Sequence, residues 1–462
     1  MGKNMCRMDY EERCKKIYQV DMTTGSLIKN VLWFVLPMCL GNILQQLYGI
    51  VDTLVIGKFC GANSLAAVGT STKPVEILLC VFLGIGTGIS ILISQYTGSG
   101  DKKRMKELVQ TSITFLYVSA IPLTVLGPFF GIAILKFMKV PEDVYGAATS
   151  YINLVLLGTI GNMGYNMNAG ILRGFGDSMS SLIFLVVACG INILLDLILV
   201  GKLGMDIEGA AIATSVSMLT AWIFSILYIR KKYQELEFPF FPHSINKEML
   251  KGILTVGLPL GLNSSIYSLG HILLQSLINA QGTIFIAGCT IGEKIDNIGN
   301  MANAAFASAG TTYAGQNLGA GKKEKLKSGM IRIPVMASVF CLGMAIIILV
   351  FSNKITMLFT SDVQIQKAAV LYILWTMPFM WIFALFNTMM GIVNGLGIVK
   401  YPTIVNLISL WVIRIPVCYL LGNLFGKKYL LGGIAASYLF AFLCMLIFVF
   451  IHWKNGTKKK LI

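Results

Sequence analysis

The chain has few charged residues for its length. Asp, Glu, Lys and Arg make up 13% of its 462 residues, and apolar residues make up 56%. The mean hydropathy is +0.75. A soluble protein of this size needs a more charged surface than this sequence provides. The composition therefore excludes an ordinary water-soluble protein and indicates a chain that uses the lipid bilayer as its solvent.

The sequence also lacks the patterns of a disulfide framework and of a cleavable signal. Most of its ten cysteines lie within apolar runs, where Cys usually serves as a small packing residue. The first 26 residues mix charges of both signs and contain no apolar core segment, so we expect no signal peptide. Membrane insertion then depends on the first true span.

Apolar runs long enough to cross a bilayer recur along the chain. They predict an all-α polytopic membrane protein with twelve transmembrane helices, at about residues 28–56, 65–92, 108–135, 146–171, 180–200, 209–229, 250–279, 283–312, 328–352, 366–393, 403–421 and 431–452.

The basic residues predict the orientation of these helices. If both termini are cytoplasmic, the inner tails and loops hold 26 of the 37 Lys and Arg residues. The positive-inside rule therefore predicts the cytoplasmic (inner) membrane with both termini inside the cell. The net charge of +16 is explained by this topology and by anionic lipid, so we expect no nucleic-acid partner.

An internal repeat appears at an offset of 221 residues. "SQYTGSGDKKRMKEL" at 94–108 lies over "GQNLGAGKKEKLKSG" at 315–329, and the same offset places "GILRGFG" at 170–176 on "GIVNGLG" at 391–397. Two distant loops that share one offset indicate two homologous halves. Each half has an even number of helices, so both halves begin on the same side of the membrane and the two repeats are parallel.

This repeat predicts the domain organisation. We expect a cytoplasmic tail at 1–26, an N-lobe at 27–230, a cytoplasmic linker at 231–249, a C-lobe at 250–452 and a basic tail at 453–462.

Two acidic residues lie within predicted spans without a cation nearby in the sequence. "QQLYGIVDTLVIG" places Gln45, Tyr48 and Asp52 on one helical face, and "INILLDLILV" does the same for Asn192 and Asp196. Charges inside a membrane are costly and usually face a bundle interior or a wet cavity. Two buried carboxylates cannot both ionise cheaply, so such a pair can hold a proton or Na⁺.

Three other ionisable residues of a predicted span have a simpler explanation, and one residue has none. Glu293 and Asp296 flank Lys294 near the expected outer end of a helix, where their side chains can reach the membrane surface. Arg414 has no partner nearby in the sequence, and its role stays open.

Together these motifs resemble the multidrug and toxic compound extrusion (MATE) family, in particular its DinF and MepA-type bacterial branch. The resemblance extends over residues 27 to 452 and rests on "LYGIVDTLVIGKFCGANSLAAVG" (47–69), "ILRGFGDS" (171–178), "NILLD" (192–196), "GIVNGLG" (391–397) and "WVIRIPV" (411–417).

The resemblance implies a cation-coupling site in the N-lobe. In that family, cation entry at such a site drives export. The implied residues here are Asp52, Tyr151, Asn166, Asn192, Asp196 and Thr214, with Gln45 also fitting and Asn168 as an alternative to Asn166. Na⁺, if it binds, would be held by Asp52, Asn192, Asp196 and Thr214.

The C-lobe departs from the NorM-type branch of the family. That branch adds acids on the seventh and tenth helices, and this chain has none there. The coupling site is therefore expected in the N-lobe alone. His271 is the remaining titratable group on the seventh helix; it and Asn168, Glu293, Asp296 and Arg414 are secondary candidates for a substrate cavity.

The resemblance implies a secondary antiporter, not an enzyme, that exports organic cations or amphipathic drugs in exchange for H⁺ and/or Na⁺. We expect no cofactor and a monomer in the bilayer. A lipid-linked oligosaccharide or polysaccharide flippase of the same superfamily is the alternative. A remote alternative is an intramembrane aspartyl protease, because "GFGD" at 174–177 matches its GxGD pattern.

Overall fold

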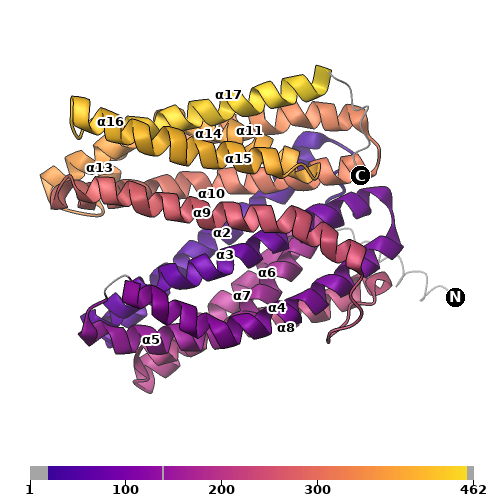
Figure 1. Cartoon of the computed structure of the whole chain (residues 1–462), viewed down its shortest axis with the longest axis horizontal. Helices are drawn as coiled ribbons and strands as arrows, with labels where there is room; N and C mark the ends of the chain where they lie inside the picture. The colour runs from indigo at the N-terminus through magenta and orange to yellow at the C-terminus, as the bar shows by residue number, and fades with distance from the viewer. Residues whose placement is uncertain (1–18, 138–139, 455–462) are drawn as a thin grey trace. The chain divides into compact units, whose positions relative to one another are not determined.

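The computed structural model describes residues 19–137 and 140–454, and all its regular elements in these ranges are helices (Figure 1). Of the two predicted tails, residues 1–18 and 455–462 lie outside the described residues. Contacts divide the chain into two compact units, which we describe separately. Within the described ranges, unit 1 comprises residues 19–21, 36–137 and 140–262, and unit 2 comprises residues 22–35 and 263–454.

Two long helices belong partly to each unit, namely α2 (Leu27–Phe59) and α9 (Lys247–Asn279). The unit boundaries therefore fall inside helices, whereas our predicted lobe boundaries lie between helices and stay a prediction. The other helices of unit 1 are α3 (Ala62–Ser99), α4 (Lys102–Phe137), α5 (Glu142–Leu157), α6 (Thr159–Gly174), α7 (Ser178–Asp196), η1 (Leu197–Lys202), α8 (Asp206–Lys232) and η2 (Gln234–Leu236).

Unit 2 contains the second set of helices. They are α10 (Thr283–Gly319), α11 (Lys323–Val350), α12 (Ser352–Met357), α13 (Val363–Thr376), η3 (Met377–Phe379), α14 (Met380–Gly395), α15 (Lys400–Ile408), η4 (Ser409–Arg414), α16 (Ile415–Phe425) and α17 (Gly432–Lys454).

The predicted repeat reappears in the helix boundaries. An offset of 221 residues carries the first residues of α3, α4, α5 and α6 onto those of α10, α11, α13 and α14. The packing repeats as well, because α3 packs against α5 and α6, and α10 packs against α13 and α14. These four helices of each unit therefore share one arrangement, and the two sets come from different halves of the chain.

Fewer helices meet the length and hydropathy required of a membrane span than the twelve that the sequence predicts. In the described residues, ten helical segments are long and apolar enough to cross a membrane, and the bent pair α5–α6 makes eleven. The remaining predicted span coincides with α10, whose 37 residues extend about 55 Å at 1.5 Å per residue. Its many Gly and Asn residues and its three charges give it a more polar composition.

Several predicted spans are interrupted rather than continuous. The fourth bends by 49° between α5 and α6 at Gly158. A Cβ atom at Gly158 would lie 2.2 Å from Cβ of Ser215, so glycine permits this close approach to α8. The fifth and eleventh spans contain π-helical turns, η1 and η4. Such turns shift the side-chain register and are frequent at functional sites.

The helices expose large apolar side chains on their outer faces. Phe129 is 70% exposed in unit 1, and Val350 is 71% exposed in unit 2. Such side chains are costly in water but suit hydrocarbon, so these faces match a lipid environment. The interior of unit 1 holds an apolar cluster that includes Val55, Ala148, Tyr151 and Val200.

Candidate cation-coupling site

The two predicted acidic residues meet inside unit 1. Asp52 lies on α2 and is 9% exposed, and Asp196 ends α7 and is fully buried. Their carboxyl groups are within side-chain hydrogen-bonding range of each other. Two helices that are distant in the sequence therefore bring the two carboxyl groups together.

The two carboxyl groups are more stable when they share a cation than when both are ionised. Oδ1 of Asp52 and Oδ1 of Asp196 are both buried without a hydrogen-bond partner among the described residues. Two carboxylates have no proton to donate, so two ionised groups at this separation would repel each other in a poorly hydrated environment. One proton between them turns the repulsion into a hydrogen bond, and the pair titrates as a unit.

Neutral polar groups surround the acid pair. In the orientation that satisfies both neighbours, the Asn192 amide donates to Oδ2 of Asp196 at 3.0 Å and accepts from the Thr214 backbone N–H at 3.3 Å. The Tyr48 hydroxyl donates to Oγ1 of Thr214 at 3.0 Å. The cluster therefore joins α2, α7 and α8 through a chain of hydrogen bonds.

Tyr48 and Tyr151 complete the surroundings of the pair. Both lie close enough to interact electrostatically with Asp52 and Asp196. Tyr151 on α5 also packs within the apolar cluster of unit 1. Tyr48 was on the predicted face with Asp52, but sequence reasoning did not assign it to the site. The spacing of four residues between Tyr48 and Asp52, which places both on one face of the helix, is the sequence feature that indicates a place for Tyr48 in the site.

Three predicted residues have other surroundings. Gln45 is exposed, and the described contacts do not join it to the acid pair. Asn166 donates to the backbone oxygen and to Oδ1 of Asn162, both at 2.9 Å. Asn168 is fully buried and donates to Oγ of Ser225 at 2.8 Å. The coupling role of these three residues stays a prediction, because their contacts do not connect them to the acid pair.

The other secondary candidates, His271, Glu293, Asp296 and Arg414, lie in unit 2. His271 is exposed, with its ring centroid 4.9 Å from that of Tyr267. Glu293 and Asp296 are partly buried on α10, several turns from the helix end at which we expected them, whereas Lys294 is exposed. Arg414 is buried with 4% exposure.

Asp177 of the GxGD pattern is held in a structural network. It is fully buried and caps α7 by accepting the Ser180 backbone N–H at 3.0 Å. Its Oδ2 accepts from Lys232 Nζ at 2.7 Å and from the Tyr228 hydroxyl at 3.0 Å. Burial, together with the nearby negative charge of Asp177, raises the pKa of Tyr233 well above its usual range. These contacts explain Asp177 without a catalytic role.

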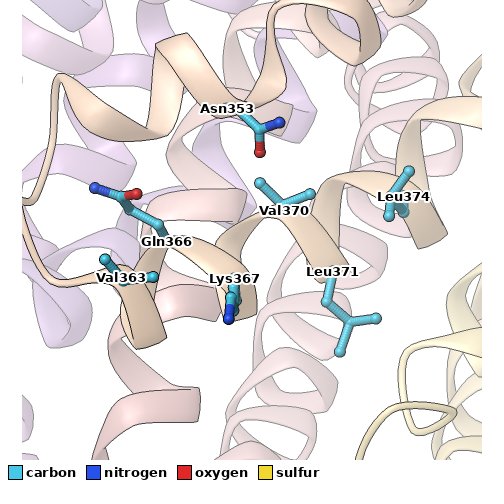
Figure 2. A pocket seen from close by; sticks show the side chains of 7 residues that line it. All are labelled: Asn353, Val363, Gln366, Lys367, Val370, Leu371 and Leu374. Atoms are coloured by element: carbon cyan, nitrogen blue, oxygen red, sulfur yellow. The ribbon is translucent and has the colours of Figure 1, made fainter.

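A surface cavity of about 300 Å³ lies elsewhere, along α12 and α13 (Figure 2). Its lining is mainly apolar, with Asn353, Gln366 and Lys367 as the polar members. None of the coupling-site residues contributes to it.

The donor set of the acid pair suits a small monovalent cation. Among the described residues, no three His, Cys, Asp or Glu side chains group as a metal site. Two carboxylates with nearby hydroxyl groups can hold a proton, and oxygen ligands of this kind can also hold Na⁺.

We expect Tyr48→Phe to slow export without abolishing it. The substitution removes the hydroxyl that links α2 to Thr214, and such a hydrogen bond contributes about 1 kcal/mol. The initial rate of dye efflux from cells should fall roughly 5-fold, which is the factor that this energy represents.

A double-mutant cycle tests this link. Tyr48→Phe combined with Thr214→Val should be no slower than the slower single variant, because both remove the same bond. Tyr419→Phe, at a 56% exposed tyrosine, serves as the control. Independent, additive losses in the double variant would contradict a functional Tyr48–Thr214 link.

Comparison with known proteins places the chain in a family. The MatE family model matches it twice, at residues 37–198 and 259–420, once in each half. The "Probable multidrug resistance protein YoeA" of Bacillus subtilis is 28% identical over 446 residues, which cover 94% of this chain and 95% of that protein. The "Multidrug export protein MepA" of Staphylococcus haemolyticus is 25% identical, covering 92% and 93%.

The fold is shared with solved transporter structures. One is described as the "Outward-facing conformation of a multidrug resistance MATE family transporter of the MOP superfamily". It matches with a TM-score of 0.89 and 23% identity, over 96% of this chain and 99% of that one. The DinF and MepA-type branch stays a prediction. The two family matches together span most of the chain, which therefore belongs to the MatE family and is a transporter of the MATE type, not an enzyme.

Proposed function

We propose that this chain exports organic cations or amphipathic drugs in exchange for H⁺ and/or Na⁺, with Asp52 and Asp196 as the coupling pair. The observation that carries the proposal is the meeting of two buried carboxyl groups from α2 and α7 within hydrogen-bonding range. The basic residues and the bacterial relatives support the cytoplasmic membrane, with both termini inside. We also infer that the monomer is the working unit.

Cation binding changes the forces within the site. With one proton or Na⁺ bound, the pair is held together and its charge is reduced. When the cation leaves, two negative charges repel and draw water, which favours a different arrangement of α2 against α7. The π-helical turn η1 follows Asp196 directly, so a register change can occur beside the acid.

The same charge change couples cation entry to drug export. The ionised pair attracts positive charge, and a bound coupling ion removes that attraction. One elementary charge crossing 100 mV supplies about 2.3 kcal/mol. That free energy can sustain roughly a 50-fold concentration gradient of another solute.

Transport into inverted membrane vesicles tests the proposal. Uptake of the fluorescent cation ethidium is measured with a pH gradient and with a Na⁺ gradient, imposed separately. We expect at least one gradient to drive uptake, and vesicles with Asp52→Asn to show none. Gradient-driven uptake that persists in Asp52→Asn vesicles would remove the pair from coupling, and no response to either gradient in wild-type vesicles would contradict antiport.

A further inference from the structure

Arg414 is a buried charge in unit 2 that the coupling mechanism does not use. It is the last residue of the π-helical turn η4 and is 4% exposed. A charged side chain at membrane depth costs about 2.5–3.5 kcal/mol on insertion scales, and such residues usually mark a functional site. Its surroundings therefore indicate what it binds.

Neutral groups make the direct contacts of Arg414. Its Nε donates to Oγ of Ser437 at 2.9 Å, and its Nη1 donates to the Tyr267 hydroxyl at 3.3 Å. The guanidinium carbon lies 5.2 Å from the ring centroid of Tyr438. A guanidinium group carries five N–H donors in a planar fork, so these two hydrogen bonds leave donors for a further acceptor.

The acidic groups of the cluster lie farther from the guanidinium. Asp296 interacts electrostatically with Arg414 and with Glu293, and its Oδ2 accepts from Asn300 at 2.8 Å. Among the described residues, Arg414 and Asp296 form no ion pair within 4.0 Å. The protein therefore places opposite charges in one cluster and holds them apart.

Tyrosines connect the two charged ends. Tyr267 and Tyr438 contact the guanidinium, and Tyr372 interacts electrostatically with both Asp296 and Arg414. Tyr267, Glu293 and Asp296 are each partly exposed, so these three members of the cluster are not sealed by the protein. The cluster thus offers an anion receptor, aromatic surfaces and a cation receptor within unit 2.

We propose that this cluster is a subsite for zwitterionic aromatic amphiphiles. The ligand's carboxylate binds the Arg414 guanidinium, its aromatic part lies against the tyrosines, and its cationic group lies toward Asp296 and Glu293. Arginine binds carboxylates through two parallel hydrogen bonds, and tyrosine faces attract cations. The inference rests on the export function proposed above, because the ligand is cargo of that transporter.

A role in packing alone does not explain why position 414 carries a charged arginine. Replacing buried charged groups by apolar residues of similar volume is often neutral or stabilising, so packing alone does not require a charge here. Lysine in its place would keep the charge but lose the fork that binds a carboxylate. These two differences determine the test variants.

Equilibrium binding to a matched dye pair tests the subsite. Rhodamine 110 carries a free carboxylate, and rhodamine 123 is its methyl ester. Fluorescence polarisation is measured with the purified full-length protein in nanodiscs. We expect wild-type protein to bind rhodamine 110 at least 10-fold more tightly than its ester. Arg414→Gln should remove this preference while changing the Kd for rhodamine 123 less than 2-fold.

Further variants keep the test decisive if Arg414→Gln does not fold. Arg414→Lys should retain part of the preference, and Tyr267→Phe should weaken rhodamine 110 binding roughly 3-fold with little effect on the ester. Asp296→Asn should weaken both dyes and preserve their ratio. Equal binding of both dyes by wild-type protein, or equal loss of both in the Arg414 and Tyr267 variants, overturns the proposal.

Binding separates this inference from the coupling proposal. Asp52→Asn protein should still prefer rhodamine 110, because the subsite residues belong to unit 2 and need no ion gradient. Failure of gradient-driven transport with the dye preference intact would therefore contradict only the coupling mechanism, and the reverse result would contradict only the subsite.

Discussion

Asp52→Asn and Asp196→Asn are each expected to abolish drug resistance in a pump-deficient bacterium, while the amount of protein in the membrane stays unchanged. Asparagine has nearly the shape of aspartic acid but cannot ionise, so the pair can no longer take up and release a cation. The loss should bring the minimal inhibitory concentration of ethidium down to that of cells with an empty vector. Immunoblots of membranes measure the expression.

Two controls define the specificity of this effect. Asp101→Asn makes the same substitution at a 40% exposed side chain that caps the start of α4, and resistance should persist. Glu293→Gln should be milder than either change in the acid pair, because Glu293 lies in unit 2 outside the coupling cluster. Full resistance in either Asp52→Asn or Asp196→Asn cells would exclude the proposed coupling site.

Asp177→Ala is expected to cause the largest loss of stability among single polar substitutions. It removes the cap of α7 and leaves the Lys232 ammonium, whose side chain is 9% exposed, without its carboxylate partner. Breaking a buried ion pair from one side costs about 3–5 kcal/mol. Thermal unfolding of the purified protein should therefore occur several degrees lower than in the wild type.

The chain provides a matched control for the capping contribution. Asp362 caps α13 by accepting the Gln364 backbone N–H at 2.7 Å, and it is exposed. Asp362→Ala should cost only about 1 kcal/mol, the usual value of a cap. Adding Lys232→Met to Asp177→Ala should restore part of the loss. Equal unfolding temperatures for Asp177→Ala and Asp362→Ala would contradict the importance of the buried pair.

The contrast between Asp177 and the coupling acids comes from their partners. Asp177 follows a short loop and resembles a catalytic aspartate by motif alone, yet a lysine and two tyrosines hold its Oδ2. Asp52 and Asp196 have no such cation within the described contacts of their cluster. A sequence motif identifies the aspartate, but its contacts decide whether its negative charge is permanently paired or can take up and release a cation.

Local pattern determined much of the fold in advance. Apolar runs require helices in a bilayer, because every backbone polar group must be satisfied internally. The shared loop sequences predicted the offset that now relates the starts of α3 and α10. The breaks were not predictable in the same way, because the bend at Gly158 depends on the approach of Ser215 from another helix.

For this protein, the sequence by itself determined the helical membrane class, the repeat and the helical faces that carry Asp52 and Asp196. Periodicity along one helix contains that information. Only the tertiary structure decided that the two acids meet, that Tyr48 reaches Thr214, and that Arg414 contacts hydroxyl groups rather than an acid. Those contacts join helices far apart in the chain, and their formation depends on how whole helices pack.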